Sequence, residues 1–359
     1  AMMLPVALGV VRRAPAAQDG DSGRTDGGAR PPPPQPGMGQ RFRIGLLLSI
    51  AYAASIGGLL TPVGSPPNLI TIGLLETATG TRIDFLRWML FAAPLVALLA
   101  VAMFGLVRWR FPSPVAAGAD SANAARRRSA LEPWTRGQRN CAFAFGVAAV
   151  LWLVPGVVAM ALPDSAARKL LATRLDEAVV AVFAATLLFL LPTDWRRRTF
   201  TIEWRQAAGI DWGTLLLFGG GLSLGGMMFE SGLAKVIGTG LAEALGAQSR
   251  FAVVALAAAL GVLLSELTSN TAATNMVVPV VISLAQARGL DPTLPAIAAC
   301  FGASLGFMLP ISTPPNAIVY GTGMIPIGRM FSTGVLLDVL GLIVVIAGLL
   351  VLAPLVAAG

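Results

Sequence analysis

The sequence contains no histidine, and only 12% of its residues are Asp, Glu, Lys or Arg. Without histidine, a zinc protease motif that contains histidine and a Ser-His dyad inside a membrane are both impossible. Cysteine is scarce as well: Cys141 and Cys300 are the only two, and each falls in or beside an apolar segment. Such positions favour a small, buried hydrophobic role over a structural disulfide. These absences exclude several classes of enzyme.

Hydrophobic residues, in contrast, make up 55% of the 359 residues, more than an ordinary globular domain carries. They gather in segments long enough to cross a hydrocarbon core of roughly 30 Å as helices, about seven of them as full spans. The clearest predicted spans are residues 85–108, 141–162, 177–192, 212–229 and 331–353, and interrupted apolar segments lie near 43–75 and 294–323. The sequence therefore predicts an all-α integral membrane protein, with the lipid bilayer as a partner.

The net charge of +8 does not indicate nucleic acid binding, because the basic residues lie in loops between spans and not on one amphipathic face. Placing four of these loops in the cytoplasm gathers most of the lysine and arginine residues on one side. The four loops are residues 12–43, 108–140, 193–210 and 324–330. This topology predicts a multi-pass protein of the bacterial inner membrane with its C-terminus outside.

A polar stretch divides the apolar segment between residues 251 and 287. It runs from Ser265 to Thr271 and lies between apolar arms at 251–264 and 272–287, each of which is predicted to be too short to span comfortably. A polar tip inside a membrane must be satisfied by protein, ion or water. The pattern predicts a re-entrant hairpin.

The chain also carries an internal repeat. Residues 58–70 and 306–318 share a Gly, three prolines, an Asn and an Ile at a constant offset of 248, which makes six identities in thirteen positions. By the predicted topology, the two copies cross the membrane in opposite directions. Paired, proline-interrupted segments in two inverted halves are the sequence indication of a transport site near the bilayer midplane.

A double proline breaks the helix in each copy, at Pro66 and at Pro314, because proline lacks an N–H and pushes the preceding residue out of the helical region. Ser65 and Thr313 are predicted to cap the helices that follow, with the prolines at the first helical position. Hydroxyls, free N–H groups and the positive ends of helix dipoles would then face an anion.

The hairpin tip offers carbonyl and side-chain oxygens, which suit a hard cation such as sodium. Asn270 and Thr271 can also donate hydrogen bonds to carboxylate oxygens. The predicted site is polar but neutral: it binds a dianion without a permanent Lys or Arg partner, and bound sodium supplies the compensating charge.

Three motifs resemble the divalent anion sodium symporters, which carry dicarboxylates, citrate or sulfate. The motifs are Ser269-Asn270-Thr271, Gly64-Ser65-Pro66-Pro67-Asn68 and Ser312-Thr313-Pro314-Pro315-Asn316. The resemblance implies that the anion contacts Ser65, Asn270, Thr271, Thr313 and Pro314. It implies sodium sites at Ser265, Thr268, Asn270 and Ser312 and, partly, at Gly64. It further implies a homodimer whose transport domain moves like an elevator against a scaffold.

That family has two signature hairpins, and this chain shows one. Pro5 resembles Pro279 in the second half, so the missing signature would fall before residue 1, and the chain is predicted to be truncated at its N-terminus. The predicted organisation is a hairpin tail (1–11), a disordered cytoplasmic insert (12–42), first-repeat transport helices (43–110), a cytoplasmic loop (111–140), scaffold helices (141–250) and second-repeat transport helices (251–359).

The expected function is sodium-coupled symport of a C4-dicarboxylate such as succinate, malate or fumarate, with no organic cofactor and no enzymatic activity. A sodium-independent exchanger and a sulfate carrier of the same fold are alternatives, and a truncated scaffold that does not transport is an alternative of another class. Asp338, an acid within the last span, is expected to be a buried hydrogen-bonding group, with a proton relay as the alternative.

Overall fold

The computed structural model describes residues 38–80, 82–112, 133–162, 165–166, 170–171, 174–245 and 249–353. The predicted hairpin tail and nearly all of the predicted insert lie outside these residues. The chain divides into two compact units, residues 1–82, 91–115 and 218–359 in the first and 83–90 and 116–217 in the second. Helices α4 (Phe85–Arg110) and α10 (Trp212–Glu230) begin in the second unit and continue into the first.

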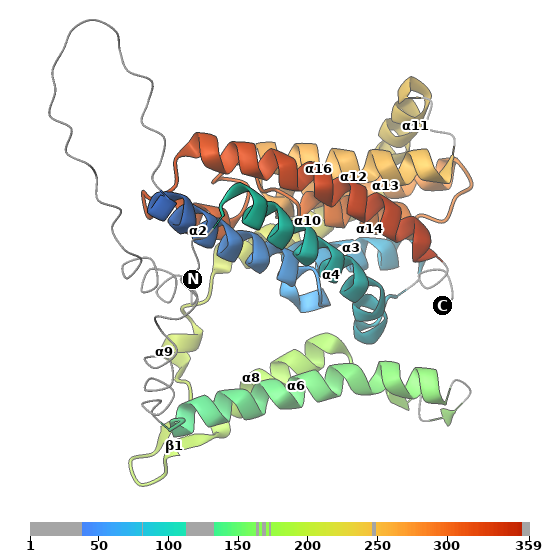
Figure 1. Ribbon diagram of the computed structural model, residues 1–359. Coiled ribbons are helices and arrows are strands. Elements are labelled where there is room, and N and C mark those ends of the chain that lie inside the picture. Colours follow the sequence, from blue (N-terminus) through green and yellow to red (C-terminus); the bar gives the residue numbers. More distant parts are fainter. Residues whose placement is uncertain are drawn as a thin grey trace, which may run out of the picture. The chain divides into compact units, whose positions relative to one another are not determined.

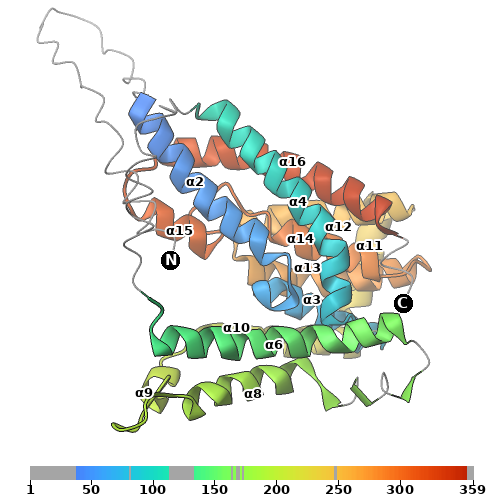
Figure 2. The same cartoon turned by 60° about the horizontal axis from the view of Figure 1, so that its bottom comes forward.

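The first unit contains both copies of the repeat, and its helices are drawn in Figure 1. The first copy comprises α2 (Met38–Gly58), a 3-10 turn η1 (Pro62–Gly64) and α3 (Pro66–Thr79). The remaining helices are α11 (Leu233–Leu245), α12 (Arg250–Leu267), α13 (Asn270–Ala287), α14 (Thr293–Ala303), α15 (Pro314–Tyr320) and α16 (Ile327–Val351). Helix α15 packs against α2, so the two copies are in contact (Figure 2).

The second unit is built on two apolar helices, α6 (Arg136–Ala161) and α8 (Glu177–Leu190), which pack against each other. Ala148, Val180 and Ala184 form its buried centre. An antiparallel pair of short strands, β1 (Pro192–Asp194) and β2 (Thr199–Phe200), follows α8 and leads to the short helix α9 (Trp204–Ala207). The described chain is therefore helical apart from this one hairpin.

Five described helices are long and apolar enough to cross a membrane, namely α4, α6, α10, α12 and α16. Four of them confirm predicted spans. The predicted span at 177–192 is confirmed only as a shorter apolar helix, because α8 has 14 residues, fewer than the roughly 20 residues of a typical perpendicular span. Asp176 caps this helix by accepting from Ala178 N at 2.9 Å, and Pro192 begins the strand that follows it.

Two predicted loops are shorter than expected because helices extend past the apolar residues. Helix α2 begins at Met38, so residues 38–42 are not part of a disordered insert. Helix α6 begins at Arg136, where Thr135 and Gln138 form a capping box. A capping box satisfies two otherwise orphan N–H groups, which allows the helix to start in polar sequence, and the predicted loop 111–140 is too long at that end.

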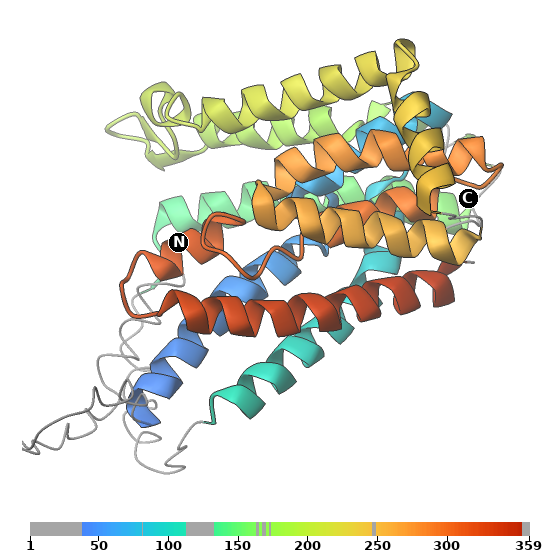
Figure 3. The same ribbon diagram turned by 90° about the horizontal axis from the view of Figure 1, so that it is seen from above.

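The two arms around the polar stretch are also longer than predicted. Helices α12 and α13 have 18 residues each and lie side by side (Figure 3). By length and composition α12 reaches the minimum for a candidate membrane span, so this arm is longer than the predicted 251–264. Ser265 and Glu266 belong to α12 and not to an open tip. The boundary between transport and scaffold helices remains a prediction.

Helices α12 and α14 approach so closely that only glycine fits at their crossing. A Cβ on Gly261 would lie 2.5 Å from the Ala299 carbonyl oxygen, and one on Gly302 would collide with the Ala258 carbonyl. Small residues at helix crossings allow this backbone approach in membranes. Helix α14 is buried from Leu294 to Ala303, and it packs against α12 at this crossing.

Replacing Gly302 by Val should lower stability by about 1–3 kcal/mol, because the side chain overpacks a backbone contact. Thermal unfolding of the purified chain in detergent would measure the loss. The control is Gly105→Val in α4, where a Cβ would meet no atom within 4 Å. Equal midpoints for the two variants would show that the two helices do not cross closely at this point.

Candidate functional site

The two helix breaks are built alike, down to individual hydrogen bonds. The Asn68 amide donates to the carbonyls of Gly58 at 2.9 Å and Thr61 at 2.8 Å. At the same offset of 248, the Asn316 amide donates to the carbonyls of Gly306 at 3.0 Å and Leu309 at 3.1 Å. Both asparagines are fully buried. The repeat is therefore structural, and each asparagine satisfies one carbonyl, that of Gly58 or of Gly306, whose helical donor is missing because a proline lies four residues later.

The two predicted N-caps differ. Thr313 caps α15 as predicted, because its hydroxyl accepts from Asn316 N at 3.3 Å. Ser65 occupies the N-cap position of α3, but its hydroxyl makes no capping bond. Asn68 N donates instead to the Ser65 carbonyl, at 3.1 Å. The capping prediction is thus correct for Thr313 and wrong for Ser65, whose hydroxyl is not used by its own helix.

Only two residues, Thr268 and Ser269, separate α12 from α13. The Thr268 hydroxyl donates to the Leu264 carbonyl at 2.7 Å, and the Ser269 hydroxyl accepts from Ala272 N at 3.2 Å. Thr271 lies half-buried in the first turn of α13. The polar side chains of the connection therefore satisfy its backbone, as a membrane environment requires.

Asn270 joins the hairpin to the second break. Its side-chain amide group lies 3.0 Å from the Ala303 carbonyl, 3.1 Å from the Ser312 carbonyl and 2.6 Å from the Ser265 hydroxyl. Two of these neighbours can only accept, which assigns the NH2 group to this side. Three of the predicted site residues, Ser265, Asn270 and Ser312, are thus brought into direct contact.

Glu266 is the principal residue that the sequence analysis left out of the site. It is 6% exposed, and its carboxylate accepts from Met308 N at 2.9 Å, Leu309 N at 3.2 Å and the Ser312 hydroxyl at 2.8 Å. Its position as the single acid between two apolar arms was the available signal, because a buried carboxylate needs donors. The predicted neutrality of the site must be corrected, since an acid adjoins Ser312.

A second acid lies beside the first. Asp338 is 2% exposed, and its carboxyl interacts electrostatically with Glu266. Neither of its oxygens has a hydrogen-bond partner in good geometry. The prediction that Asp338 is buried and faces other helices is confirmed, and Glu266 and the Phe307 backbone are its polar neighbours.

The first copy of the repeat is linked to the surroundings of Asn270 by contacts with α14 and with the segment after α14. Cys300, in the last turns of α14, lies 3.5 Å from the Asn68 side-chain oxygen, and Ala303 at its end lies against Asn270. Tyr52 of α2 donates to the Phe307 carbonyl at 3.3 Å, and the two rings pack with centroids 5.0 Å apart. No hydrogen bond among the described residues joins Gly64, Ser65, Thr271 or Pro314 to Asn270.

The oxygens gathered here belong to hydroxyls, carbonyls and the carboxyl groups of Glu266 and Asp338. No cluster of three or more His, Cys, Asp and Glu side chains that could hold a metal ion occurs in the part of the chain that the structure describes. This chemistry does not suit a transition metal and fits hard cations that take oxygen ligands. The arrangement can bind a small cation next to hydroxyl and N–H donors that suit an anion.

Comparison with known proteins gives a match over residues 1–357 to a family described as the sodium:sulfate symporter transmembrane region. The sodium-dependent dicarboxylate transporter SdcS of Staphylococcus saprophyticus is 30% identical over 356 residues, which cover 98% of this chain and 65% of that protein. SdcS of Staphylococcus aureus is 30% identical over 361 residues, with coverage of 99% and 65%. The chain spans 65% of the length of these relatives.

Removing either break asparagine should destabilise the fold. Asn68→Ala leaves the Gly58 carbonyl without a donor, and Asn316→Ala does the same to the Gly306 carbonyl, because the prolines four residues later have no N–H. We expect each variant to cost about 1–3 kcal/mol. Unfolding midpoints in detergent measure the effect. Thr77→Ala is the control, because the exposed Thr77 hydroxyl bonds only a carbonyl of its own helix. If the asparagine variants unfold at the same temperature as the control, the carbonyls have other donors.

Proposed function

The chain belongs to the sodium:sulfate symporter family, and on this premise we propose that it carries a small divalent anion across a membrane together with sodium. The family is defined by a transmembrane region, which confirms the prediction of a multi-pass membrane protein. The matched family and both relatives are transporters by description, which confirms the prediction that the chain is not an enzyme. Substrate, coupling and mechanism are proposals.

The contact that carries the proposal is the one between Asn270, Ser265 and Ser312. It joins the connection between α12 and α13 to the second helix break. The first break repeats the second in its asparagine bonds. Paired breaks beside a polar hairpin end provide polar backbone within an otherwise apolar unit, which is the arrangement expected of a carrier's binding site.

We assign the sodium ions to oxygens at and near this contact. The ligands would be Ser265, Thr268, Asn270 and Ser312 for one ion, with Gly64 contributing to another. The carboxylate of Glu266 supports the assignment, because it lies 2.8 Å from the Ser312 hydroxyl, and a negative charge beside a site favours a cation. Sodium is cargo here and not a resident cofactor.

The anion would contact Ser65, Asn270, Thr271, Thr313 and Pro314. Ser65 and Thr313 each keep a hydroxyl donor for a ligand, because Ser65 makes no capping bond and Thr313 only accepts in its cap. The negative charge of Glu266 repels an anion that binds without cations. Sodium must therefore bind together with the anion, because its charge offsets the repulsion between two negative groups.

For the anion, we favour a C4-dicarboxylate such as succinate, malate or fumarate, because both relatives are named dicarboxylate transporters. Sulfate is the second candidate, since the family description names it and hydroxyl donors also serve a tetrahedral dianion. A sodium-independent exchanger would not use Glu266 and its neighbours for a cation. A chain that does not transport and acts as a scaffold is the alternative of another class.

We further propose that the chain works as a homodimer, in which a domain carrying both breaks moves against a fixed scaffold. The placement in a bacterial inner membrane with the C-terminus outside is part of the same proposal. It rests on the distribution of basic loops between apolar helices. A cysteine-labelling experiment with an impermeant reagent on Ala353→Cys would test the orientation.

Uptake by liposomes tests the function itself. With the chain reconstituted, we expect labelled succinate to accumulate when a sodium gradient points inward, and choline in place of sodium to abolish uptake. Excess sulfate should compete weakly. Accumulation in choline would identify the exchanger, and stronger competition by sulfate than by unlabelled succinate would reverse the choice of anion. Absence of uptake in all conditions, with the chain folded, would support the scaffold.

Ser312→Ala should weaken the binding of sodium more than the binding of the anion. The variant removes a proposed ligand and the hydroxyl bonded to Glu266, and we expect the half-saturating sodium concentration to rise about tenfold, which corresponds to roughly 1.4 kcal/mol. Ser49→Ala is the matched control, because the Ser49 hydroxyl bonds the Gly45 carbonyl of its own helix. An unchanged sodium dependence would remove Ser312 from the cation site.

A further inference from the structure

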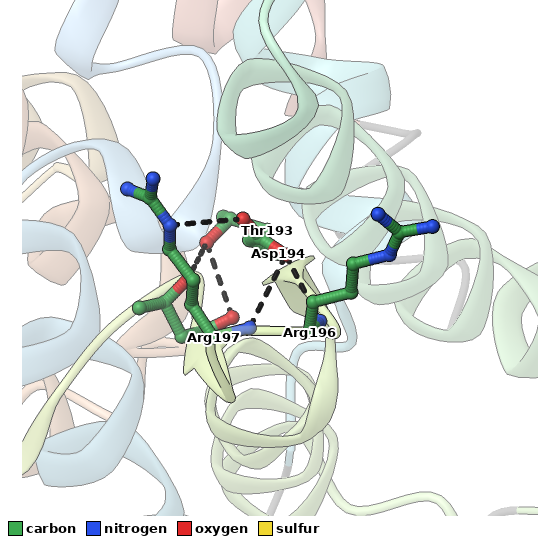
Figure 4. Close-up of polar contacts among 5 residues, drawn as sticks. Thr193, Asp194, Arg196 and Arg197 are labelled. Atoms are coloured by element: carbon green, nitrogen blue, oxygen red, sulfur yellow. Dashed lines mark hydrogen bonds and ion pairs between the residues drawn. The ribbon is translucent and has the colours of Figure 1, made fainter.

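A tight turn at one end of the second unit projects a row of arginines into solvent. The Asp194 carboxylate accepts from Arg196 N at 2.9 Å and from Arg197 N at 3.3 Å, which closes the turn between β1 and β2. Thr193 and Thr199 bond across the strand pair at 3.1 Å. Figure 4 shows the Arg196 and Arg197 side chains extending to different sides of this turn. The turn is thus defined by its own contacts, and its guanidinium groups point outward.

The start of α6 is tied to the same turn. The Asn140 amide donates to the Pro192 carbonyl at 3.2 Å and to the Thr201 hydroxyl at 2.8 Å. These bonds hold the first turns of α6, with the exposed Arg136 and Arg139, against the two strands. Residues far apart in the sequence are thereby assembled on one end of the unit.

The assembled surface is strongly basic. We call it the arginine patch and define it by Arg136, Arg139, Arg196, Arg197, Arg198 and Arg205, all of which are exposed. Among the described residues, the single ion pair in the patch joins the Arg197 Nε atom to Asp194 at 3.7 Å, and the Arg197 side chain is 84% exposed. A long, exposed pair contributes little. The guanidinium groups therefore retain their capacity to bind an anion.

Tryptophans accompany the arginines. Trp134 is 64% exposed, Trp195 73%, Trp204 75% and Trp212 58%, and all four lie in the second unit at the ends of its helices or in the turn. Exposed tryptophan is unfavourable in water but common where a membrane meets water. The combination with arginine is typical of a surface that contacts lipid headgroups.

The patch lies where apolar helices end. Helix α6 begins there, α8 ends two residues before β1, and α10 begins after α9. Helices α6 and α10 are long and apolar enough to cross a membrane, and α8 is a shorter apolar helix. Their common polar end must therefore lie at the level of the lipid headgroups.

Arg198 occupies a position where glycine is usual. Its φ of 52° is the only positive φ of a described residue other than glycine, and such a conformation carries a cost for a residue with a side chain. Glycine would close the turn without that cost. Topology alone requires basic residues somewhere in this loop, and it does not explain an arginine at its strained position.

We propose that the arginine patch is a binding site for the phosphate headgroups of anionic phospholipids in the leaflet that it faces. The guanidinium groups donate bidentate hydrogen bonds to phosphate oxygens. The tryptophan side chains lie among the same headgroups. The patch thereby anchors the second unit in an anionic membrane.

Binding of single lipids to the delipidated chain in detergent, followed by native mass spectrometry, tests the site. Phosphatidylglycerol should bind more tightly than phosphatidylcholine. The triple variant Arg196→Gln/Arg197→Gln/Arg198→Gln should lose about fivefold in phosphatidylglycerol affinity for each arginine removed, with phosphatidylcholine unaffected. The control Lys235→Gln/Arg250→Gln/Arg288→Gln removes the same charge from the first unit and should retain the affinity.

Arg198→Gly separates binding from folding. It removes the strain and the charge together, so we expect an unfolding midpoint equal to or above that of the parent chain and a fivefold weaker affinity for phosphatidylglycerol, about 1 kcal/mol. Equal losses in the two triple variants would overturn the proposal. So would displacement of the lipid by excess inorganic phosphate, or a change of oligomeric mass without a change in lipid binding.

Discussion

Backbone carbonyls that lose their helical partners within apolar surroundings must find another donor, and this constraint shapes the first unit. Pro62 and Pro310 remove the helical donors of the Gly58 and Gly306 carbonyls, and buried asparagine amides replace them. Asn68 and Asn316 each bridge two carbonyls, seven and ten residues upstream. Because an unpaired carbonyl is costly in hydrocarbon, these amides stabilise the breaks. Two interruptions of helical backbone are thus retained within an otherwise apolar unit.

The second break is held by more than its asparagine. Asn270 and Glu266, at the end of the α12–α13 hairpin, contact the segment from Met308 to Ser312 through its N–H groups, a carbonyl and a hydroxyl. Hairpin and break are consequently held together by several hydrogen bonds. The close crossing of α12 with α14 extends these contacts to the helix whose Cys300 lies against Asn68. The proposed cation ligands are therefore positioned by one connected set of contacts.

The second unit contains neither of the two helix breaks, and its proposed contact with the membrane is the arginine patch. Its arginines and tryptophans are held at the ends of apolar helices by a turn that satisfies its own backbone and by Asn140. Nothing in this arrangement depends on the broken helices. Anchoring and transport would then be served by separate parts of the chain, and each can be tested by variants that leave the other unchanged.

Apolar length, the paired prolines and the offset of 248 residues determined from the sequence alone that the chain is a helical membrane protein with two broken segments. Local rules were sufficient there, because proline acts on its own helix and span length reflects bilayer thickness. The partners of polar groups were decided by tertiary structure. Nothing near Glu266 in sequence reveals that Met308, Leu309 and Ser312 supply its donors. The end of α12 that carries Glu266 was mispredicted for the same reason: a buried polar group takes the partner that packing brings, and that partner is often distant in the chain.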